Sequence, residues 1–374
     1  MMVIYLLRIL FAKKYFEKIK IDDRRKIDQK KYTVIQPILS GDIRLKDVLM
    51  RNIKNLSEMN FLWLIDKGDD EAERIVSEII SEENCKERIK VLEMEKVPQD
   101  MNPKIFKIKE SLGRVQTEYM IILDDDSIIN TKRIDELSMY EDIKGDWLAT
   151  GIPYNYGIQG FWSKFVAAFI NSNSIITYFT MSYLEKNKTI NGMFYIARTE
   201  TFRKHNVFEE IKYWLCDDFA LAQNMLSKNI TIIQTGIFCN TGTTIKNFRQ
   251  YLLLMKRWLL FTKIYMKNAM TLYFLIFILL PSILSSVLLI MGISMGINYI
   301  LTLFLALLIK SLILYRLRFF MLGEREEKFA VIREMINDIG IFFIFIYTLI
   351  TPPVIKWRDK KIRVAEGKIR YEKI

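Results

Sequence analysis

Short apolar runs alternate with charged segments through the first third of the chain. The apolar runs YTVIQP (32–37), FLWLI (61–65), IKVLEM (89–94) and YMIIL (119–123) are bounded by polar residues, which is typical of strands with little exposure to water. The segments between them, at 45–55, 71–81 and 105–116, have helical character. Strands that alternate with helices predict an α/β fold with a mainly parallel sheet.

The pattern changes in the last third, where residues 268–309 include no charged residue. A run of this length can form two membrane-spanning helices of about 20 residues each, and we expect a break near 292–298 to make them a hairpin. A third apolar stretch, 339–355, contains Pro352 and Pro353. We expect it to form a re-entrant or broken helix that returns the tail to the side where the hairpin begins.

Two further segments combine apolar and basic residues. The N-terminal MMVIYLLRILFAKKYF is interrupted by Arg8, and it predicts an interfacial helix or a truncated anchor. NFRQYLLLMKRWLLFTK (247–263) predicts an amphipathic helix on a membrane surface. The expected organisation is an N-terminal segment (1–27), an α/β catalytic domain (28–245), an interface helix (246–267), a membrane region with two or three hydrophobic segments (268–355) and a basic tail (356–374).

Charge supports a membrane location for this chain. The formal net charge is +12, and the basic residues gather beside the apolar segments, as the positive-inside rule describes. They are Lys256, Arg257, Lys263, Lys267, Arg316, Arg318, Lys356, Arg358, Lys360, Lys361 and Arg363. The sequence has no zinc-finger or RNA-binding signature, so we expect no nucleic-acid partner. We expect an integral membrane protein, in the plasma or inner membrane if bacterial, with a cytosolic catalytic domain.

Cysteine and histidine usage restricts the chemistry. Cys85, Cys216 and Cys239 lack the spacing of a metal site, and a reducing cytosol is the simpler interpretation than a disulfide framework. His205 is the single histidine, which excludes His-rich metal sites and argues against a His-based catalytic triad. Any metal must therefore be held by oxygen ligands.

Two acidic clusters follow predicted strands. Asp124, Asp125 and Asp126 come directly after 119–123, while Asp66, Asp69 and Asp70 follow 61–65. In parallel sheets, ligands bind beyond the carboxyl ends of the strands. The D-x-D pair of Asp124 and Asp126 suits Mg²⁺ or Mn²⁺, which take carboxylate oxygens and substrate phosphates. A solvated acidic turn or a helix cap is the alternative for so short a motif.

Two later motifs have similar dual interpretations. Asp217 and Asp218 precede a helix-like run, where carboxylates stabilise a helix N-terminus by capping alone. The functional interpretation is a general base that deprotonates an acceptor hydroxyl. Arg257 and Trp258 lie in the amphipathic segment. An arginine fork suits a diphosphate leaving group, and an indole can form a wall of an active site.

The ordered set of motifs resembles membrane-bound family-two glycosyltransferases, and most closely ceramide glucosyltransferases and related lipid glycosyltransferases. The resemblance extends from about Thr33 to Val364. The segments that carry it are VIQPILSGDIRLKDVL, DKGDDEA, NPKIFKI, the D-x-D of DDD, GIPYNYGIQGFW, INGMFYIARTETF, the pair Asp217–Asp218, the pair Arg257–Trp258 and VIKWRDKKIRV. It implies a GT-A (Rossmann-like) nucleotide-sugar domain, followed by an amphipathic interface helix and a C-terminal membrane helix region.

The resemblance also implies roles for individual residues. A nucleotide-sugar site would include Pro37 and Asp70 at the base and ribose, with Asp66 nearby, Lys104 on the nucleotide and Asp124 toward ribose or diphosphate. Asp126, with Asp124, would hold the metal. Asp218 would be the catalytic base, with Asp217 where the family more often has Glu. Arg257 and Trp258 match the end of the (Q/R)-x-x-R-W motif.

That last motif departs from the family at its first position, which is Leu254. Arg249 and Gln250 lie one turn earlier, and whether either replaces the missing side chain stays open. The segment 160–184 is apolar and aromatic, which fits core packing, with entry into the bilayer and contact with a lipid as the alternative.

The expected activity is an inverting, metal-dependent transfer of a hexose, by default from UDP-glucose, to a lipid hydroxyl at the cytosolic membrane surface. Two alternatives remain. One is a processive polysaccharide synthase, which usually has the full motif and more membrane helices. The other is a membrane protein that binds a nucleotide sugar without turnover.

Overall fold

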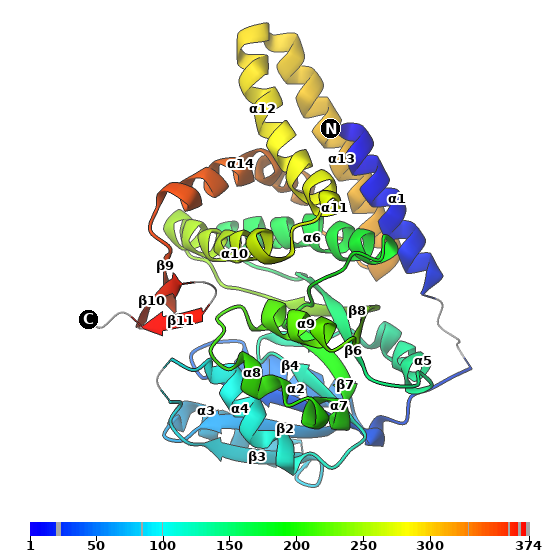
Figure 1. Cartoon of the computed structure of the whole chain (residues 1–374), viewed down its shortest axis with the longest axis vertical. Coiled ribbons are helices and arrows are strands. Elements are labelled where there is room, and N and C mark those ends of the chain that lie inside the picture. The colour runs from blue at the N-terminus through cyan, green and yellow to red at the C-terminus, as the bar shows by residue number, and fades with distance from the viewer. Residues whose placement is uncertain are drawn as a thin grey trace.

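The computed structural model describes residues 1–19, 24–83, 85–98, 100–327, 329–357, 360–365 and 368–371. A sheet domain forms one end of the molecule (Figure 1). Above it lie α6 (Phe161–Tyr183), α10 (Phe248–Ala269) and α14 (Ala330–Ile350), and beyond these project α12 (Leu280–Met295) and α13 (Ile297–Leu322). The helical part is therefore stacked on one side of the sheet domain.

The sheet has eight strands in the order β3-β2-β1-β4-β7-β6-β8-β5. The strands are β1 (Tyr32–Pro37), β2 (Asn60–Asp66), β3 (Ile89–Met94), β4 (Tyr119–Leu123), β5 (Ser127–Ile129), β6 (Trp147–Tyr154), β7 (Phe194–Arg198) and β8 (Thr231–Thr241). β1 pairs in parallel with β2 and β4, and β2 with β3, so the parallel half predicted from the apolar runs is confirmed. β7 runs antiparallel to β4 and β6, which makes the whole sheet mixed.

Helices cover both faces of this sheet because successive strand residues point to opposite sides. Val34 and Trp63 pack on the face covered by α2 (Leu45–Asn55) and α3 (Asp70–Glu82). Ile35 and Leu64 pack on the other face, with α4 (Pro103–Ser111) and α9 (Asp217–Ser227). The remaining helices of the domain are short: α5 (Ser138–Glu141), α7 (Thr199–Lys204), α8 (Val207–Ile211) and 3₁₀ turns at Gln29–Lys31, Leu112–Arg114 and Thr131–Leu137.

The apolar run after residue 268 forms the expected helical hairpin. Two helical stretches, Leu272–Met295 and Ile297–Leu322, are long and apolar enough to cross a membrane. The first consists of α11 (Leu272–Phe274), a π-helical turn (Leu275–Leu279) and α12. Gly296 separates the two stretches with φ of 106°, a conformation that glycine adopts without a steric penalty.

The third apolar segment differs from the prediction. α14 is one unbroken helix that ends just before Pro352, so the expectation of a broken helix is wrong, while the re-entrant alternative stays a prediction. α14 lies across the end of the α12–α13 pair that is nearer the sheet domain, and it contacts α6 and α10 (Figure 1). Lys256 Nζ donates to the Pro352 carbonyl at 2.9 Å. The tail beyond it contains a small antiparallel sheet of β9 (Val354–Trp357), β10 (Lys360–Ala365) and β11 (Lys368–Tyr371).

The N-terminal helix α1 (Met2–Lys18) lies along α13 and α6 (Figure 1). Ile9, Ala12 and Phe16 are buried against these helices, whereas the side chain of Leu10 is exposed. Arg8, which interrupts the apolar run, is buried and donates from its guanidinium to Thr177 Oγ1 at 3.1 Å. The arginine is therefore part of a polar contact between helices.

Candidate active site

Lys104 brings two acidic motifs together. Its Nζ lies 2.6 Å from Asp124 Oδ1 at the end of β4 and 3.6 Å from Asp217 Oδ2 at the start of α9. It also donates to the Gly192 carbonyl at 2.6 Å. Burial acts to lower the pKa of Lys104, but the carboxylates of Asp124 and Asp217 outweigh it and raise the pKa. Lys104 is thus a permanent cation between the D-x-D motif and the predicted base.

Local sequence explains the position of this lysine. Pro103 occupies the first turn of α4, where its missing N–H costs nothing. The side chain of Asn102 accepts hydrogen bonds from Lys104 N at 3.0 Å and Ile105 N at 3.3 Å, which caps the helix. The NPK motif therefore begins a helix and directs the lysine toward the carboxyl ends of the strands.

The other two acids of the first cluster are poorly solvated. Asp125 Oδ2 accepts from Leu39 N at 2.7 Å, and Asp126 Oδ1 accepts from Ser127 Oγ at 3.0 Å. Burial and the neighbouring Asp126 raise the pKa of Asp125 to about 7. Burial and Asp124 raise the pKa of Asp126 to about 6. Burial is the larger cause of both shifts and the neighbouring carboxylates add to it, so both acids lie in a partly buried, acidic edge of the sheet.

The acids after β2 lie at the same edge as Pro37, the last residue of β1. Asp66 Oδ1 lies 2.9 Å from Lys107 Nζ, which also donates to the Ile38 carbonyl at 2.9 Å. Asp69 caps α3 through Ala72 N, so the capping interpretation holds for this residue. Asp70 is exposed in the first turn of α3. The structure thus places Pro37, Asp66 and Asp70 around one strand edge.

Asp218 is oriented by two donors on one of its oxygens. Oδ1 accepts from Phe219 N at 2.7 Å and from Cys216 Sγ at 3.0 Å. The backbone of Gly192 lies against the Asp218 side chain, because a Cβ added to this glycine would lie 3.0 Å from Asp218 Cβ. Sequence reasoning missed the roles of Cys216 and Gly192 toward Asp218, although Gly192 belongs to a segment that carried the family resemblance.

Asp217 lies closer to Lys104 than Asp218 does. Burial raises the pKa of Asp217 to about 6, with Lys104 acting to lower it and Asp218 to raise it. Its Oδ2 has no hydrogen-bond partner among the described residues. Asp217 therefore belongs to the Lys104 cluster, while Asp218 lines a cavity between the helices.

Arg257 and Trp258 approach the site from α10. Arg257 Nε is buried and, within the described parts of the chain, has no hydrogen-bond partner. Burial lowers the pKa of Arg257, while the carboxylate of Asp126 acts to raise it. Trp258 stacks on Phe169 of α6, with ring centroids 5.9 Å apart. The guanidinium therefore retains an unused donor within the field of the D-x-D motif.

Leu254, the departure from the family motif, is buried in an apolar cluster with Phe165 and Met255. Gln250 Oε1 accepts from Lys246 N at 2.8 Å at the start of α10. The leucine contributes to the packing of α10 on α6, and the side-chain oxygen of Gln250 satisfies a local backbone group.

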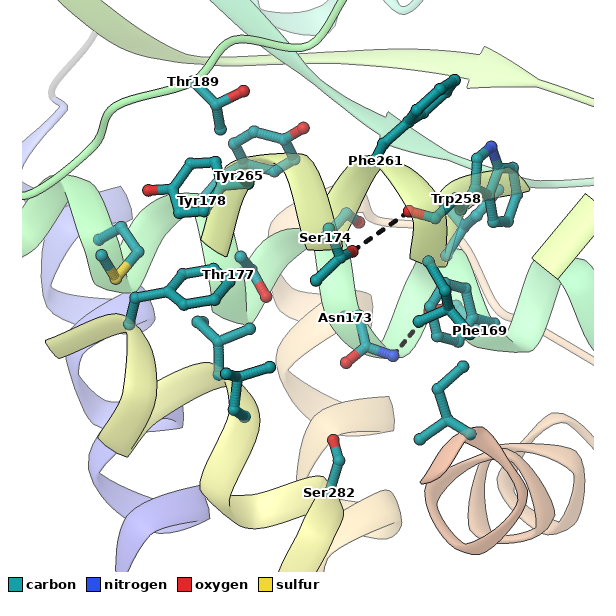
Figure 2. A pocket seen from close by; sticks show the side chains of 18 of the residues that line it. Phe169, Asn173, Ser174, Thr177, Tyr178, Thr189, Trp258, Phe261, Tyr265 and Ser282 are labelled. Atoms are coloured by element: carbon teal, nitrogen blue, oxygen red, sulfur yellow. Dashed lines mark hydrogen bonds between the residues drawn. The ribbon is translucent and has the colours of Figure 1, made fainter. Parts of the chain in front are cut away.

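Asp218 and Trp258 both line a cavity of about 590 Å³. α6, α10, α12 and α14 form its walls, which are mainly apolar and include Phe169, Phe261 and Tyr265. In Figure 2 Thr189 lies at the end near the sheet domain and Ser282 at the α12 end. A mainly apolar chamber thus extends from the predicted base into the helical part of the molecule.

The carboxylates do not form a complete metal cage. Among the described residues, no three His, Cys, Asp or Glu side chains converge as metal ligands. Asp124 and Asp126 nevertheless offer the hard oxygen donors that Mg²⁺ and Mn²⁺ prefer, and such ions often take few protein ligands when substrate phosphates supply others. The donor chemistry and the raised pKa of Asp126 fit a cation bound together with a phosphorylated substrate.

Comparison with known proteins identifies the family. The family model described as Glycosyl transferase family 21 matches residues 2–370. A search of the curated proteins finds no match.

Among solved structures that are similar to this chain, one with a TM-score above 0.5 shares the fold. It is mannosyltransferase PcManGT from Pyrobaculum calidifontis in complex with GDP-Man and Mn²⁺, with 13% identity, a TM-score of 0.51, and coverage of 90% of this chain and 94% of that one. Another is S. aureus TarS 1-349 in complex with UDP-GlcNAc, with 15% identity, a TM-score of 0.38, and coverage of 91% and 96%. The GT-A fold expected from the sequence is confirmed.

Proposed function

The chain belongs to glycosyl transferase family 21, and we propose that it transfers a hexose, by default from UDP-glucose, to a lipid hydroxyl. It is a glycosyltransferase of GT-A type that uses nucleotide sugars. The proposal adds the donor, the acceptor, inversion at the anomeric carbon and dependence on a divalent metal. It also places the α12–α13 hairpin in a membrane with the sheet domain in the cytosol.

The observation that carries the proposal is the position of Asp218 in the wall of the 590 Å³ cavity. The carboxylate faces a chamber lined mainly by apolar and aromatic side chains, which suits an acyl or alkyl chain. The first candidate membrane-spanning stretch, Leu272–Met295, lines its far side. A lipid could therefore enter from the bilayer with its hydroxyl directed to Asp218.

The donor would lie at the carboxyl edge of the sheet. Pro37, Asp66 and Asp70 would surround the base and ribose, Lys104 would contact the nucleotide, and Asp124 would face the ribose or the diphosphate. The orphan donor of Arg257 Nε supports a role toward the diphosphate, because a buried N–H without a partner is costly unless a ligand satisfies it. Trp258 would close the side nearest the acceptor.

Asp126, with Asp124, would hold Mg²⁺ or Mn²⁺ against the diphosphate. When bound, the ion would neutralise negative charge on the leaving group. The fold relative PcManGT was solved with GDP-Man and Mn²⁺, which is consistent with this assignment. The fit rests on the two hard oxygen donors and on the excess negative charge at this edge.

The protein residues have separate tasks in the transfer. Asp218 Oδ1 is engaged by Phe219 N and Cys216 Sγ, so Oδ2 is left to take the proton of the acceptor hydroxyl. That hydroxyl oxygen attacks the anomeric carbon as the bond to the diphosphate oxygen breaks, which inverts the configuration. Arg257 stabilises the charge of the departing diphosphate. General-base catalysis of this kind contributes about 10² to 10⁴ in rate.

The experiment is a turnover screen in nanodiscs with a panel of nucleotide sugars, lipids extracted from cells, and Mg²⁺, Mn²⁺ or EDTA. Mass spectrometry should detect a lipid one hexose heavier only with metal. Long polymer would support the processive alternative, which an apolar acceptor chamber does not favour. Donor binding without any turnover would support the non-catalytic alternative.

A further inference from the structure

A further cation, Arg44, lies beside the D-x-D motif. Ser127 of β5 pairs with Thr241 of β8 in an antiparallel register. Asp126 comes directly before this pair and Gly242 directly after it, so the two residues lie at the same end of neighbouring strands, which are about 4.8 Å apart. Arg44 Nη2 donates to the Gly242 carbonyl. The guanidinium is therefore fixed close to the predicted metal ligand.

Asp42 and Gly242 hold the Arg44 side chain in this place. Asp42 Oδ1 accepts from Arg44 N at 2.9 Å, and Asp42 Oδ2 accepts from Arg44 Nη2 at 3.4 Å. The glycine makes room for the guanidinium, because a Cβ added at position 242 would lie 2.9 Å from Arg44 Cζ. The position of the guanidinium is thus set by the loop before α2 and by the end of β8.

Part of this guanidinium has no partner in the protein. A guanidinium has five N–H donors, and Nη2 alone makes the contacts to Asp42 and Gly242. Within the described residues, no group accepts a hydrogen bond from Nε or Nη1 of Arg44. The side chain is 33% exposed, so it is accessible to a ligand at the strand edge.

Arg44 is not the direct counterion of Asp126. Arg44 acts to lower the pKa of Asp126, and Asp126 acts to raise the pKa of Arg257, so the three charges interact. Neither arginine forms an ion pair with Asp126 in the parts of the chain that the structure describes, although such pairs gain most at contact. The carboxylate that does contact Arg44, Asp42, is 37% exposed, where a pair contributes little. Two guanidinium groups thus lie near Asp126 without being neutralised by it.

We propose that Arg44 binds the diphosphate of the nucleotide-sugar donor through Nη1 and, with Arg257, forms a pair of guanidinium groups on the leaving group. The diphosphate gains negative charge as its bond to the sugar breaks, and guanidinium forks suit phosphate oxygens. The inference rests on the proposed function, because it requires a nucleotide diphosphate sugar at the D-x-D edge. It adds a donor contact from the loop before α2.

The test separates binding of the diphosphate from binding of the nucleoside. UDP binding is measured by calorimetry in detergent with Mn²⁺, and uridine binding by ligand-detected NMR. Arg44→Met should raise the Kd for UDP about ten- to hundredfold, because a charge-assisted hydrogen bond is lost, and leave the Kd for uridine within about twofold. Arg44→Lys keeps the charge but not the fork, so it should raise the Kd for UDP by a smaller factor.

Gly242→Ala displaces the same guanidinium without removing its charge, since the added Cβ would lie 2.9 Å from Arg44 Cζ. It should weaken UDP binding and leave uridine binding unchanged. Arg51→Met is the matched control. Arg51 also lies on α2, but it pairs with Asp47 at 3.0 Å and is 60% exposed. Its removal should leave both Kd values unchanged.

The outcomes distinguish this inference from the proposed function. An unchanged Kd for UDP in Arg44→Met, or an equal loss of UDP and uridine binding, overturns the role of Arg44 alone. A loss of UDP binding in Arg51→Met as large as in Arg44→Met does the same. If Arg44→Met does not fold, Arg44→Lys and Gly242→Ala decide by the same comparison. A wild-type protein that binds no UDP overturns the proposed UDP-sugar donor, and the inference fails with it.

Discussion

Replacing Lys104 with methionine tests whether the two acidic motifs depend on one cation. Methionine keeps the length and most of the apolar stem of the side chain. The substitution removes the ammonium that lies 2.6 Å from Asp124 Oδ1 and 3.6 Å from Asp217 Oδ2. The side chains of Lys104, Asp124 and Asp217 are 20%, 29% and 18% exposed, so water screens the two ion pairs only in part.

The expected loss follows from these distances. At an effective dielectric constant of about 20, the ammonium attracts Asp124 by about 6 kcal/mol and Asp217 by about 5 kcal/mol. The variant no longer carries the desolvation cost of the ammonium, which is several kcal/mol. On balance, removal of one partner from a buried ion pair costs about 3–5 kcal/mol, which corresponds to a Tm lowered by about 6–20 °C for a domain of this size.

The assay is thermal unfolding in detergent, with UDP-sugar binding measured by calorimetry. Lys109→Met is the matched control, because Lys109 lies on the same helix and pairs with Glu110 and Glu209 near the surface; it should cost less than about 1 kcal/mol. Adding Asp124→Asn to Lys104→Met should restore part of the loss. Equal Tm values for the two lysine variants would refute the reasoning.

Three further predictions follow from the site and its surroundings. Gly192→Ala should lower kcat about tenfold without changing the Kd for the donor. The added Cβ would lie 3.0 Å from Asp218 Cβ and displace the base. Unchanged steady-state kinetics would contradict this prediction. Asp146 should stabilise the fold at neutral pH, because hydrogen bonds from His205 and Lys204 hold the pKa of its carboxyl far below the ordinary value. That stability is fully present above the unfolded pKa of about 4 and is lost as the pH falls toward the folded pKa. The Tm difference between wild type and Asp146→Asn should therefore shrink between pH 7 and pH 3. A Tm difference that stays constant over this range would argue against the prediction. Removal of divalent metal with EDTA should abolish transfer and Mn²⁺ should restore it, as followed by mass spectrometry; full activity in EDTA would remove the metal from the mechanism.

The strands of the parallel half were predictable because each is a short apolar run with turn residues at both ends. β1 spans the predicted residues 32–37, and β4 spans 119–123. The hairpin of α12 and α13 was predictable for a similar reason, since an uncharged run of more than 40 residues has few alternatives. Local sequence patterns were sufficient to predict those elements whose structure depends on their own residues and not on distant contacts.

Features that depend on distant contacts were not predictable. The antiparallel placement of β7 beside β4 depends on the path of the chain through α6, which no local pattern encodes. α14 begins at Ala330, before the predicted apolar stretch, and the two carboxylates in its first half, Glu334 and Asp338, both pair with Lys310 of α13. The bond from Cys216 to Asp218 needed the geometry at the start of α9, since the thiol alone suggested only a redox environment.

The most direct test of the central claim is Asp218→Asn, assayed in parallel for transfer to lipid and for binding of the nucleotide sugar. Asparagine keeps the shape of the side chain but cannot accept the proton of the acceptor. The account predicts that transfer falls by about 10²-fold or more, while the Kd for the donor stays within about twofold of wild type. Loss of donor binding to the same extent as transfer would instead make Asp218 a structural cap of α9 and contradict its role as the base.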